Sequence, residues 1–398
     1  MGAALVAALA GCGGSSEGGG RSVLLRLDGR GVGVGDGAGP LGWAKPKVWA
    51  TDAVVAVAGR DAVTGYSKDG GAKRWSVPLA DVCGFSAHHV DGRVAVMLGA
   101  TPRCGRTAVI DLRTGVKVWE RTLALGKDVS YVQALIGGGA VVANWAGGAM
   151  AFSVRDGRRL WSTPQRSRDC FFSGFGGGDM LLANRICRTA SGERATVQRL
   201  DPRTGRALWS HQLQGEVMAF AAAPVIGVGA RGRIAHLAVL DAKSGTERAR
   251  IPLPTSQEVK CDPSDRMLCK GIVVGGGSLY TKPGKAGDAG NAPIVAFDLA
   301  TGRRKWEIPH SRDGLLTPVG FEGGRLLAVR SGTKRRSAGL VEVAADSGRI
   351  VARHDIKGPR HQINDVLRQS SYVRYAAGRL LVFDDLVTKP GEVAVLIV

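Results

Sequence analysis

The sequence predicts an all-β protein: an eight-bladed β-propeller of four-stranded antiparallel blades, in which a strand from the N-terminus closes the last blade. Three observations lead to this fold class. They are the glycine content, a motif that recurs with a period of roughly 45 residues, and unpaired strands at both ends of the chain.

Glycine is unusually frequent, with 59 of 398 residues, about twice the usual share of ~7%. Together with 16 prolines, it interrupts almost every window long enough for a helix. Hydrophobic residues make up 44% of the chain, too many for a disordered protein. Many short strands joined by tight turns are therefore expected. One helix of at most two turns is predicted in His361–Leu367, where Ile363, Val366 and Leu367 have helical spacing.

The recurring motif is clearest in Leu200–Trp209, "LDPRTGRALW", and has close counterparts in Ile110–Trp119 and Phe297–Trp306. Each contains Asp, two variable residues, Thr-Gly, three further residues and Trp. Its glycine has equivalents at Gly71, Gly115, Gly157, Gly205, Gly245, Gly302 and Gly348. The fourth position after each glycine holds Trp75, Trp119, Trp161, Trp209, Ala249, Trp306 or Ala352. A period of roughly 45 residues is typical of a propeller blade with four strands.

A structural role is predicted for the motif. The Asp carboxylate can accept backbone N–H groups of the turn between the third and fourth strands, and the glycine supplies the positive φ that such turns need. Strand alternation then directs the Trp to one sheet face, between neighbouring blades. The alternative is that some of these residues contact a ligand. The motif residues are Asp111, Gly115, Trp119, Trp161, Asp201, Gly205, Trp209, Asp241, Gly245, Asp298, Gly302 and Trp306.

The two ends of the chain give the blade number. Seven motifs correspond to seven blades, and "SYVRYAAG", "RLLVFDD" and "EVAVLIV" then supply three strands of another. Arg21–Gly29 reads as a strand without neighbours in sequence. Pairing it beside Glu392–Val398 would complete an eighth blade and remove an open sheet edge. The alternative is a seven-bladed ring with a frayed C-terminal tail.

Tandem blades ending in D-x-x-T-G-x-x-x-W resemble the pyrroloquinoline-quinone-like (PQQ-like) propeller repeat over about Arg21–Val398. This repeat occurs in quinoprotein dehydrogenases, in BamB-like outer-membrane assembly lipoproteins and in many extracytoplasmic proteins. The resemblance is specific for the fold and weak for function, because function depends on sites rather than folds.

The N-terminal segment predicts export. "AALVAALAGC" is an apolar run that ends at Cys12 and resembles a bacterial lipobox, although no Lys or Arg precedes it. We therefore expect a lipoprotein signal peptide in residues 1–12, with lipidation at Cys12, a Gly/Ser tether in 13–20 and the propeller in 21–398. The protein would then be extracytoplasmic and anchored to the cell membrane. The alternative is a secreted protein without lipid.

The remaining six cysteines form three pairs that are close in sequence, and we expect three disulfides within blades. Six cysteines allow 15 connectivities, of which pairing within each blade is the economical one. Such bonds fit an oxidising compartment, and the alternative is reduced, buried thiols. A metal site is not favoured, because no pair has C-x-x-C spacing. The expected pairs are Cys83 with Cys104, Cys170 with Cys187, and Cys261 with Cys269.

No catalytic or metal-binding constellation is identified in the sequence. The chain lacks the vicinal cysteines of quinoprotein dehydrogenases, so no cofactor is expected. Ser331–Lys334 spells S-x-x-K, but without the partner motifs of penicillin-binding proteins.

The charge balance is the remaining functional signal. The chain carries 54 Lys and Arg against 34 Asp and Glu, a net charge of +20, with basic runs at Arg166–Arg168, Arg303–Lys305 and Lys334–Arg336. These runs are either solvated faces or a footprint for an anionic partner. The sequence therefore predicts a monomeric, non-catalytic module that binds proteins or anionic envelope polymers and not nucleic acid. The alternative is a ligand- or cofactor-binding propeller, such as a PQQ-dependent redox protein.

Overall fold

The computed structural model describes most of the chain. The residues that it does not describe are 1–20, 29, 33–46, 100–103, 126–131, 146–147, 164–168, 191, 223, 231–232, 254–259, 263–264, 283–291, 310–314, 334–335, 359–362, 364–366, 368–371 and 384–392.

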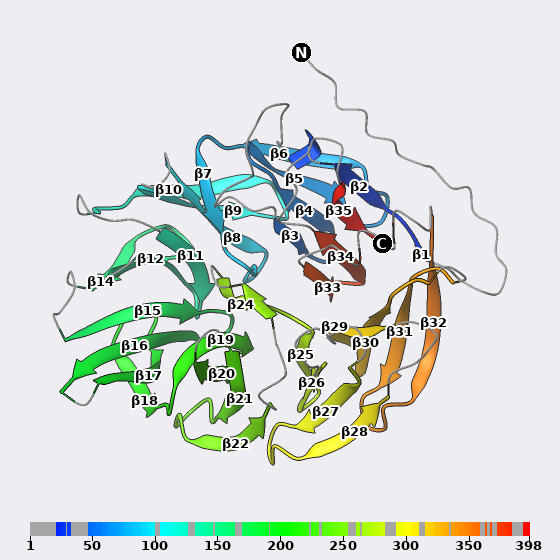
Figure 1. Cartoon of the computed structure of the whole chain (residues 1–398). Helices are drawn as coiled ribbons and strands as arrows, with labels where there is room; N and C mark the ends of the chain where they lie inside the picture. Colours follow the sequence, from blue (N-terminus) through cyan, green and yellow to red (C-terminus); the bar gives the residue numbers. More distant parts are fainter. Residues whose placement is uncertain are drawn as a thin grey trace. The chain divides into compact units, whose positions relative to one another are not determined.

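Eight sheets, each with four antiparallel strands, follow one another along the chain, and one of them gains a fifth strand, β1 (Arg21–Ser22), in parallel (Figure 1). The first four are β3–β6 (Lys47–Ala50, Val54–Ala58, Ala62–Ser67, Lys73–Pro78), β7–β10 (Val82–Phe85, Arg93–Leu98, Arg106–Asp111, Val116–Thr122), β11–β14 (Val132–Gly137, Ala140–Trp145, Gly148–Ser153, Arg159–Ser162) and β15–β18 (Cys170–Gly176, Leu181–Thr189, Gly192–Leu200, Ala207–Gln212).

The other four complete the set. They are β19–β22 (Glu216–Ala222, Val225–Ala230, Arg233–Leu240, Glu247–Pro252), β25–β28 (Ile272–Gly275, Ser278–Thr281, Ile294–Asp298, Arg304–Ile308), β29–β32 (Leu316–Glu322, Arg325–Arg330, Gly339–Ala344, Ile350–Lys357), and β33–β35 (Tyr372–Ala376, Arg379–Phe383, Val393–Ile397) joined by β2 (Leu25–Asp28). This is the strand composition of an eight-bladed β-propeller, and the predicted fold class is confirmed.

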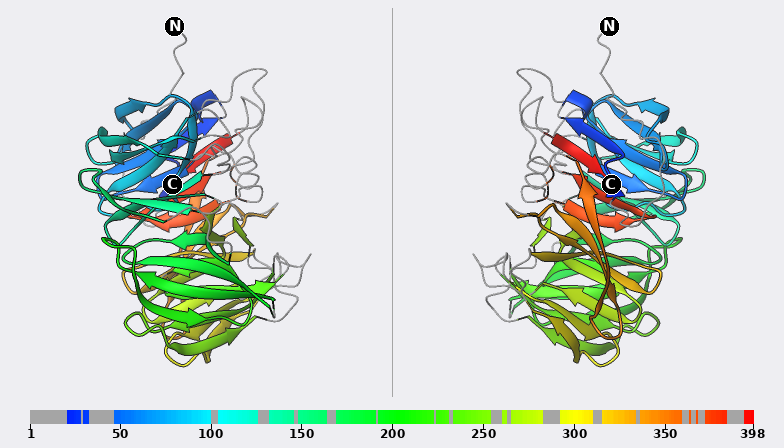
Figure 2. Two further views of the ribbon diagram at one scale, coloured as in Figure 1. Left: turned by 90° about the vertical axis from the view of Figure 1, so that its left-hand side faces the viewer. Right: turned by 90° about the vertical axis from the view of Figure 1, so that its right-hand side faces the viewer.

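The last sheet is composite, as predicted, with the order β2-β35-β34-β33. Strand β2 pairs antiparallel with β35, with Leu25 opposite Ile397 and Asp28 opposite Val393. Figure 2 shows the blue N-terminal strands against the red C-terminal strands in both views. The seven-bladed alternative is thereby excluded, because the C-terminal strands have a fourth partner.

The predicted single strand Arg21–Gly29 is in fact divided. Its first residues form β1 (Arg21–Ser22), which pairs in parallel with the outer strand β32, so that Arg21 lies opposite Ile356. The Arg21 side chain holds this segment in place: it donates to the carbonyl of Gly378 at 3.1 Å and lies over the ring of Tyr375. Arg21 thus contacts the composite sheet through its side chain while the backbone of its segment pairs with the neighbouring sheet, an arrangement that alternation in the sequence could not show.

Two compact units make up the chain, and each is described by itself. The first unit comprises Met1–Pro78, Lys270–Phe297 and Arg304–Val398, and the second comprises Leu79–Cys269 and Asp298–Arg303. Within each unit the hydrophobic core lies between successive sheets. In the second unit, for example, Met97 of β8, Trp119 of β10 and Val141 of β12 belong to one buried cluster.

Small elements accompany the sheets. They are a 3-10 turn η1 (Arg30–Val32) and a two-stranded sheet of β23 (Lys260–Asp262) and β24 (Asp265–Lys270). In the predicted short helix, Ile363 and Leu367 are helical and buried. The rest of that segment lies outside the described residues.

Candidate functional site

The seven sheets whose four antiparallel strands are consecutive in the chain each have two different ends. The turns after the first and third strands lie at one end, which we call the turn end. The connection after the second strand and the link to the next sheet lie at the other, which we call the loop end. The motif residues lie at the turn end and the described disulfides at the loop end.

The turn after each third strand is fixed by local chemistry. Asp201 Oδ1 accepts the backbone N–H groups of Arg203 at 2.7 Å and Thr204 at 3.1 Å. Gly205 has φ +71°, and its N–H donates to the Asp201 carbonyl at 2.8 Å. Only glycine adopts this φ without strain. The turns at Asp111, Asp241 and Asp298 are built in the same way.

Four of the five motif tryptophans contact the turn of the following sheet, whereas the ring of Trp75 lies against Gly65 of its own sheet. Trp209 Nε1 donates to the Ala242 carbonyl at 3.1 Å, and its ring lies against Gly245. A Cβ at Gly245 would come within 2.5 Å of that ring. The same pairing joins Trp119 to Val154 and Gly157, Trp161 to Pro202 and Gly205, and Trp306 to Ala345 and Gly348. The motif Asp, Gly and Trp residues therefore fasten adjacent sheets within each unit.

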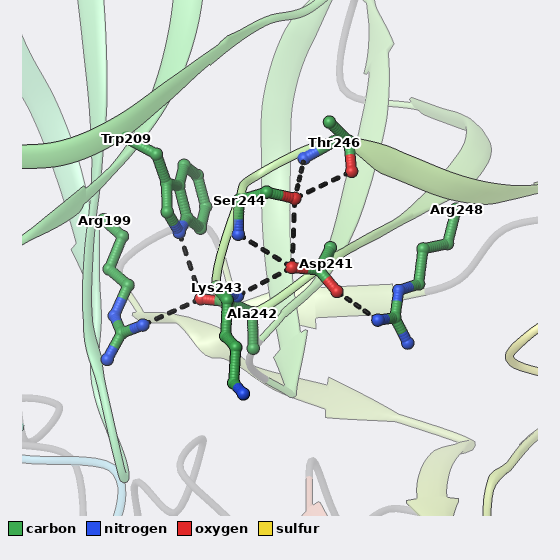
Figure 3. Close-up of polar contacts among 8 residues, drawn as sticks. All are labelled: Arg199, Trp209, Asp241, Ala242, Lys243, Ser244, Thr246 and Arg248. Carbon is green, nitrogen blue, oxygen red and sulfur yellow. Dashed lines mark hydrogen bonds and ion pairs between the residues drawn. The ribbon is translucent and has the colours of Figure 1, made fainter.

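Figure 3 shows the most elaborate of these turns. Asp241 Oδ1 accepts the backbone N–H of Ser244 at 2.7 Å, the Ser244 hydroxyl at 3.0 Å and the backbone N–H of Lys243 at 2.9 Å, and Oδ2 pairs with Arg248. These bonds, the backbone N–H of Ser244 first, lower the pKa of Asp241 to about 2. Arg199 Nη1 also donates to the Ala242 carbonyl, at 2.8 Å. The ionised Asp241 carboxylate thus binds the backbone of its own turn and the side chains of Ser244 and Arg248.

Exposed cations occupy the third position of four consecutive turns in the second unit. They are Arg113, Arg155, Arg203 and Lys243, which we call the turn cations. In each case the residue two positions before the cation, Asp or Ser, binds the cation's own backbone N–H. The backbone beneath every turn cation is therefore fixed. Aligning the repeats would have revealed this pattern, which a search for consecutive basic residues missed.

The basic runs noted in the sequence are placed differently. In Arg303–Lys305, Arg304 pairs with Glu307 at 2.8 Å and Lys305 Nζ contacts the Ser278 hydroxyl at 3.0 Å. Arg166–Arg168 and Lys334–Arg335 lie outside the described residues. Ser331 of the S-x-x-K sequence accepts the backbone N–H of Leu315 at 3.0 Å, so its hydroxyl joins two chain segments.

Disulfides lie at the loop end of two sheets in the second unit. Cys83 is bonded to Cys104, and Cys170 to Cys187, as predicted. Cys269 is also disulfide-bonded, whereas the side chain of its expected partner Cys261 lies outside the described residues.

The loop end of sheet β15–β18 carries a projecting hairpin. Strands β16 and β17 remain paired as far as Thr189 and Gly192, whereas β15 begins only at Cys170, opposite Cys187. The Cys170–Cys187 disulfide therefore ties the hairpin to β15 at its base. We call residues 185–194 the stapled hairpin. Its exposed side chains include Arg185, Arg188, Glu193 and Arg194, and Arg188 pairs with Glu193 at 3.2 Å.

The described residues contain no group of three or more His, Cys, Asp or Glu side chains that could hold a metal ion. Nor does any helix in the described part of the chain have the length and apolar character needed to cross a bilayer. Cys12, the predicted lipidation site, lies outside the described residues.

Comparisons with known proteins agree with this fold. Residues 29–170 match a family model described as outer membrane protein assembly factor BamB. Among solved structures, BamB from Moraxella catarrhalis is 15% identical, with 88% of this chain and 95% of that chain covered and a TM-score of 0.49. The quinohemoprotein alcohol dehydrogenase ADHIIG from Pseudomonas putida HK5 is 12% identical, covering 95% and 75%, with a TM-score of 0.51. No curated protein matches the sequence.

Proposed function

We propose that this protein is a membrane-tethered, extracytoplasmic propeller that acts as a non-catalytic binding module and holds an acidic protein at its stapled hairpin. The single observation that carries the proposal is the hairpin itself. It projects beyond strand β15, is cross-linked at its base and exposes three arginines against one glutamate.

The stapled hairpin is suited to binding by its preorganised backbone and its positive charge. A disulfide at the base of a hairpin limits its conformations before binding, so less entropy is lost when a partner docks. Arg185 and Arg194 have no ion-pair partner among the described residues and remain available to carboxylates. Arginine is also the basic residue most enriched at protein interfaces, where its planar fork can bind a carboxylate through two hydrogen bonds.

Several features support export of the protein and its attachment to the membrane. Structural disulfides persist in oxidising compartments. The apolar run ending at Cys12, followed by a Gly/Ser segment, has the form of a lipoprotein signal and tether. The family model that matches residues 29–170 also describes an outer-membrane assembly factor.

Four of the motif tryptophans do not fit the role of a platform for a quinone cofactor, the kind of cofactor that the repeat resemblance implies. Four of the motif indoles donate Nε1 to the carbonyl of the next turn and have their rings against its glycine. They are therefore unavailable as a platform for a planar cofactor.

Membrane attachment is tested with Cys12→Ser. We expect the variant to leave the membrane fraction and to lose labelling by a fatty-acid analogue. Unchanged labelling would contradict lipidation at this cysteine.

Partner binding is tested with a photo-crosslinking residue at position 190, at the tip of the stapled hairpin, in intact cells. A specific crosslinked protein is expected, and its yield should fall at least about ten-fold when Arg185, Arg188 and Arg194 are changed to Glu. The matched control changes Lys73, Arg74 and Lys357, which are exposed on outer strands of the first unit. Equal loss with both variants would show a nonspecific charge effect.

A further inference from the structure

The turn cations differ from some of the exposed cations on the outer strands of the same sheets. Lys117 pairs with Glu120 at 2.7 Å, and Arg250 pairs with Glu247 at 2.7 Å. None of the turn cations forms an ion pair among the described residues. Their charge is therefore available to an external anion.

Two of the carboxylates near the turn cations, those of Asp111 and Asp241, interact with other groups. Asp241 Oδ1 binds the turn backbone, and its other oxygen pairs with Arg248. Asp111 likewise binds its own turn and approaches Arg93 at 3.8 Å. Asp91, Asp156 and Asp179 are also exposed at this end, without an ion pair to the turn cations.

Two large aliphatic side chains are exposed beside these turns. Val116 is 56% exposed and Leu208 is 55% exposed, on outer strands that leave the turns of Arg113 and Arg203. Among the described residues only Val351 is a comparable exposed aliphatic, at 39%. Surfaces that bind at a membrane interface combine cations with exposed aliphatic side chains. The cations interact with lipid headgroups, and the aliphatic side chains enter the apolar region beneath them.

We propose that the turn end of the second unit, formed by the turn cations with Val116 and Leu208, is a docking surface for a bilayer that contains anionic lipid. This inference rests on the proposed function in one respect, since the tether would bring the domain to the membrane. Residues 13–20 span at most about 30 Å between Cys12 and Arg21 when fully extended. A domain held that close meets the headgroups at a high effective concentration.

An anionic bilayer suits these observations better than a soluble polyanion. Phosphate groups of either would attract the turn cations, but only a bilayer offers Val116 and Leu208 an apolar environment. Each Lys or Arg near such a surface strengthens binding by about five-fold.

The test uses the full-length chain with Cys12→Ser, so that its result does not depend on lipidation. Binding is measured by co-sedimentation with vesicles of phosphatidylcholine alone or of phosphatidylcholine and phosphatidylglycerol in a two-to-one ratio. We expect binding to the anionic vesicles only, and weakening as salt is raised. Equal binding to both vesicle types, or to neither, would overturn the proposal.

The charge variant replaces Arg155, Arg203 and Lys243 with Gln and leaves Arg113, whose guanidinium lies against Gly92. Its affinity for anionic vesicles should fall about 100-fold. The matched control replaces Lys73, Arg74 and Lys357 with Gln and should change affinity less than about three-fold. Equal effects of the two triple variants would overturn the assignment of the site, provided that both variants unfold at the same urea concentration as the parent.

The aliphatic variant, Val116→Ser with Leu208→Ser, separates a bilayer from a soluble polyanion. Affinity for anionic vesicles should fall about ten-fold, because partial burial of these side chains in lipid is lost. Binding to polyphosphate, used as the soluble probe, should not change. Vesicle binding that is insensitive to this variant would overturn the membrane proposal in favour of a soluble polyanion. A failure of the hairpin crosslinking experiment would leave these results intact.

Discussion

Sheet β15–β18 and the composite last sheet have the same four-stranded architecture but are closed in opposite ways. In the first, the outer strand follows its neighbour after one tight turn, and Arg199 lies opposite Trp209, ten positions away. In the last sheet there is no such turn, and Leu25 lies opposite Ile397, 372 positions away. Loop closure over the longer distance costs about 3 kcal/mol more in chain entropy.

The two sheets differ in the interactions that stabilise the pairing of their fourth strand. The local closure relies on one motif: a carboxylate that holds the turn, a glycine with positive φ and a tryptophan from the preceding sheet. The long-range closure has no motif and depends on buried apolar side chains, with Leu25, Val395 and Ile397 in one cluster. The following predictions test these two closures separately.

The largest effect is expected from deleting Arg21–Asp28, which removes β1 and β2. Val395 and Ile397 are completely buried and would lose their cover. Since each fully buried aliphatic side chain contributes about 1.5–3 kcal/mol, the free energy of unfolding should fall by about 4 kcal/mol or more. Urea unfolding measures the change. A chain that begins at Arg21 is the control and should match the longer protein. Equal stability of the deletion and the control would show that β2 does not close the last sheet.

The local closure is tested next with Gly245→Ala. The alanine would be held at φ +74° and its Cβ would meet the Trp209 ring at 2.5 Å. We expect a loss of about 3 kcal/mol, from the left-handed conformation and the steric overlap together. Gly139→Ala is the matched control, because Gly139 has φ +84° and open space around its Cβ position. It should cost about 1 kcal/mol. If the two variants are equally stable, the tryptophan does not pack on the glycine.

A smaller effect is expected from Trp209→Phe, which removes the N–H bond to the Ala242 carbonyl and part of the ring. A loss of about 2 kcal/mol is predicted in thermal or urea unfolding. Trp75 is the comparison, because its buried Nε1 has no hydrogen-bond partner among the described residues. Trp75→Phe should cost less, since it also removes an unsatisfied polar group. The reverse order would contradict the role of the indole N–H in fastening.

The smallest effect is a pH dependence contributed by Asp241. Its pKa falls from 3.8 to about 2 on folding. A carboxyl with a lowered folded-state pKa stabilises the protein above pH 3.8, and this contribution is lost as the pH falls through about 2. Asp241→Asn should therefore unfold at lower urea concentration than the parent at neutral pH, and the two midpoints should converge between pH 4 and 2. A difference that stays constant over this range would contradict the assignment.

Several parts of the site could not be predicted from the sequence. The Trp spacing predicted packing between sheets, but not that four of the five motif indoles donate to the turn of the following repeat. That contact joins residues such as Trp161 and Pro202, 41 positions apart, which no local rule connects. Each of the four repeats contributes one turn cation, and no two turn cations are adjacent in the sequence. Basic runs in the sequence therefore did not reveal them. The parallel pairing of Arg21–Ser22 with β32 was also missed, because it depends on the Gly378 carbonyl and the Tyr375 ring.

The sequence by itself determined the repeat, the eight sheets, the within-sheet cysteine pairs that the structure describes and the composite last sheet. These follow from local chemistry: glycine at positive φ, Asp beside turn N–H groups, and apolar strands that require partners. Only the tertiary structure decided which exposed charges remain unpaired. Arg250 pairs with Glu247, whereas Arg203 forms no ion pair with any residue that the structure describes, although both are exposed arginines close to a turn. The reason is that an ion pair depends on the separation of two side-chain ends in space, which strand register and turn geometry set together.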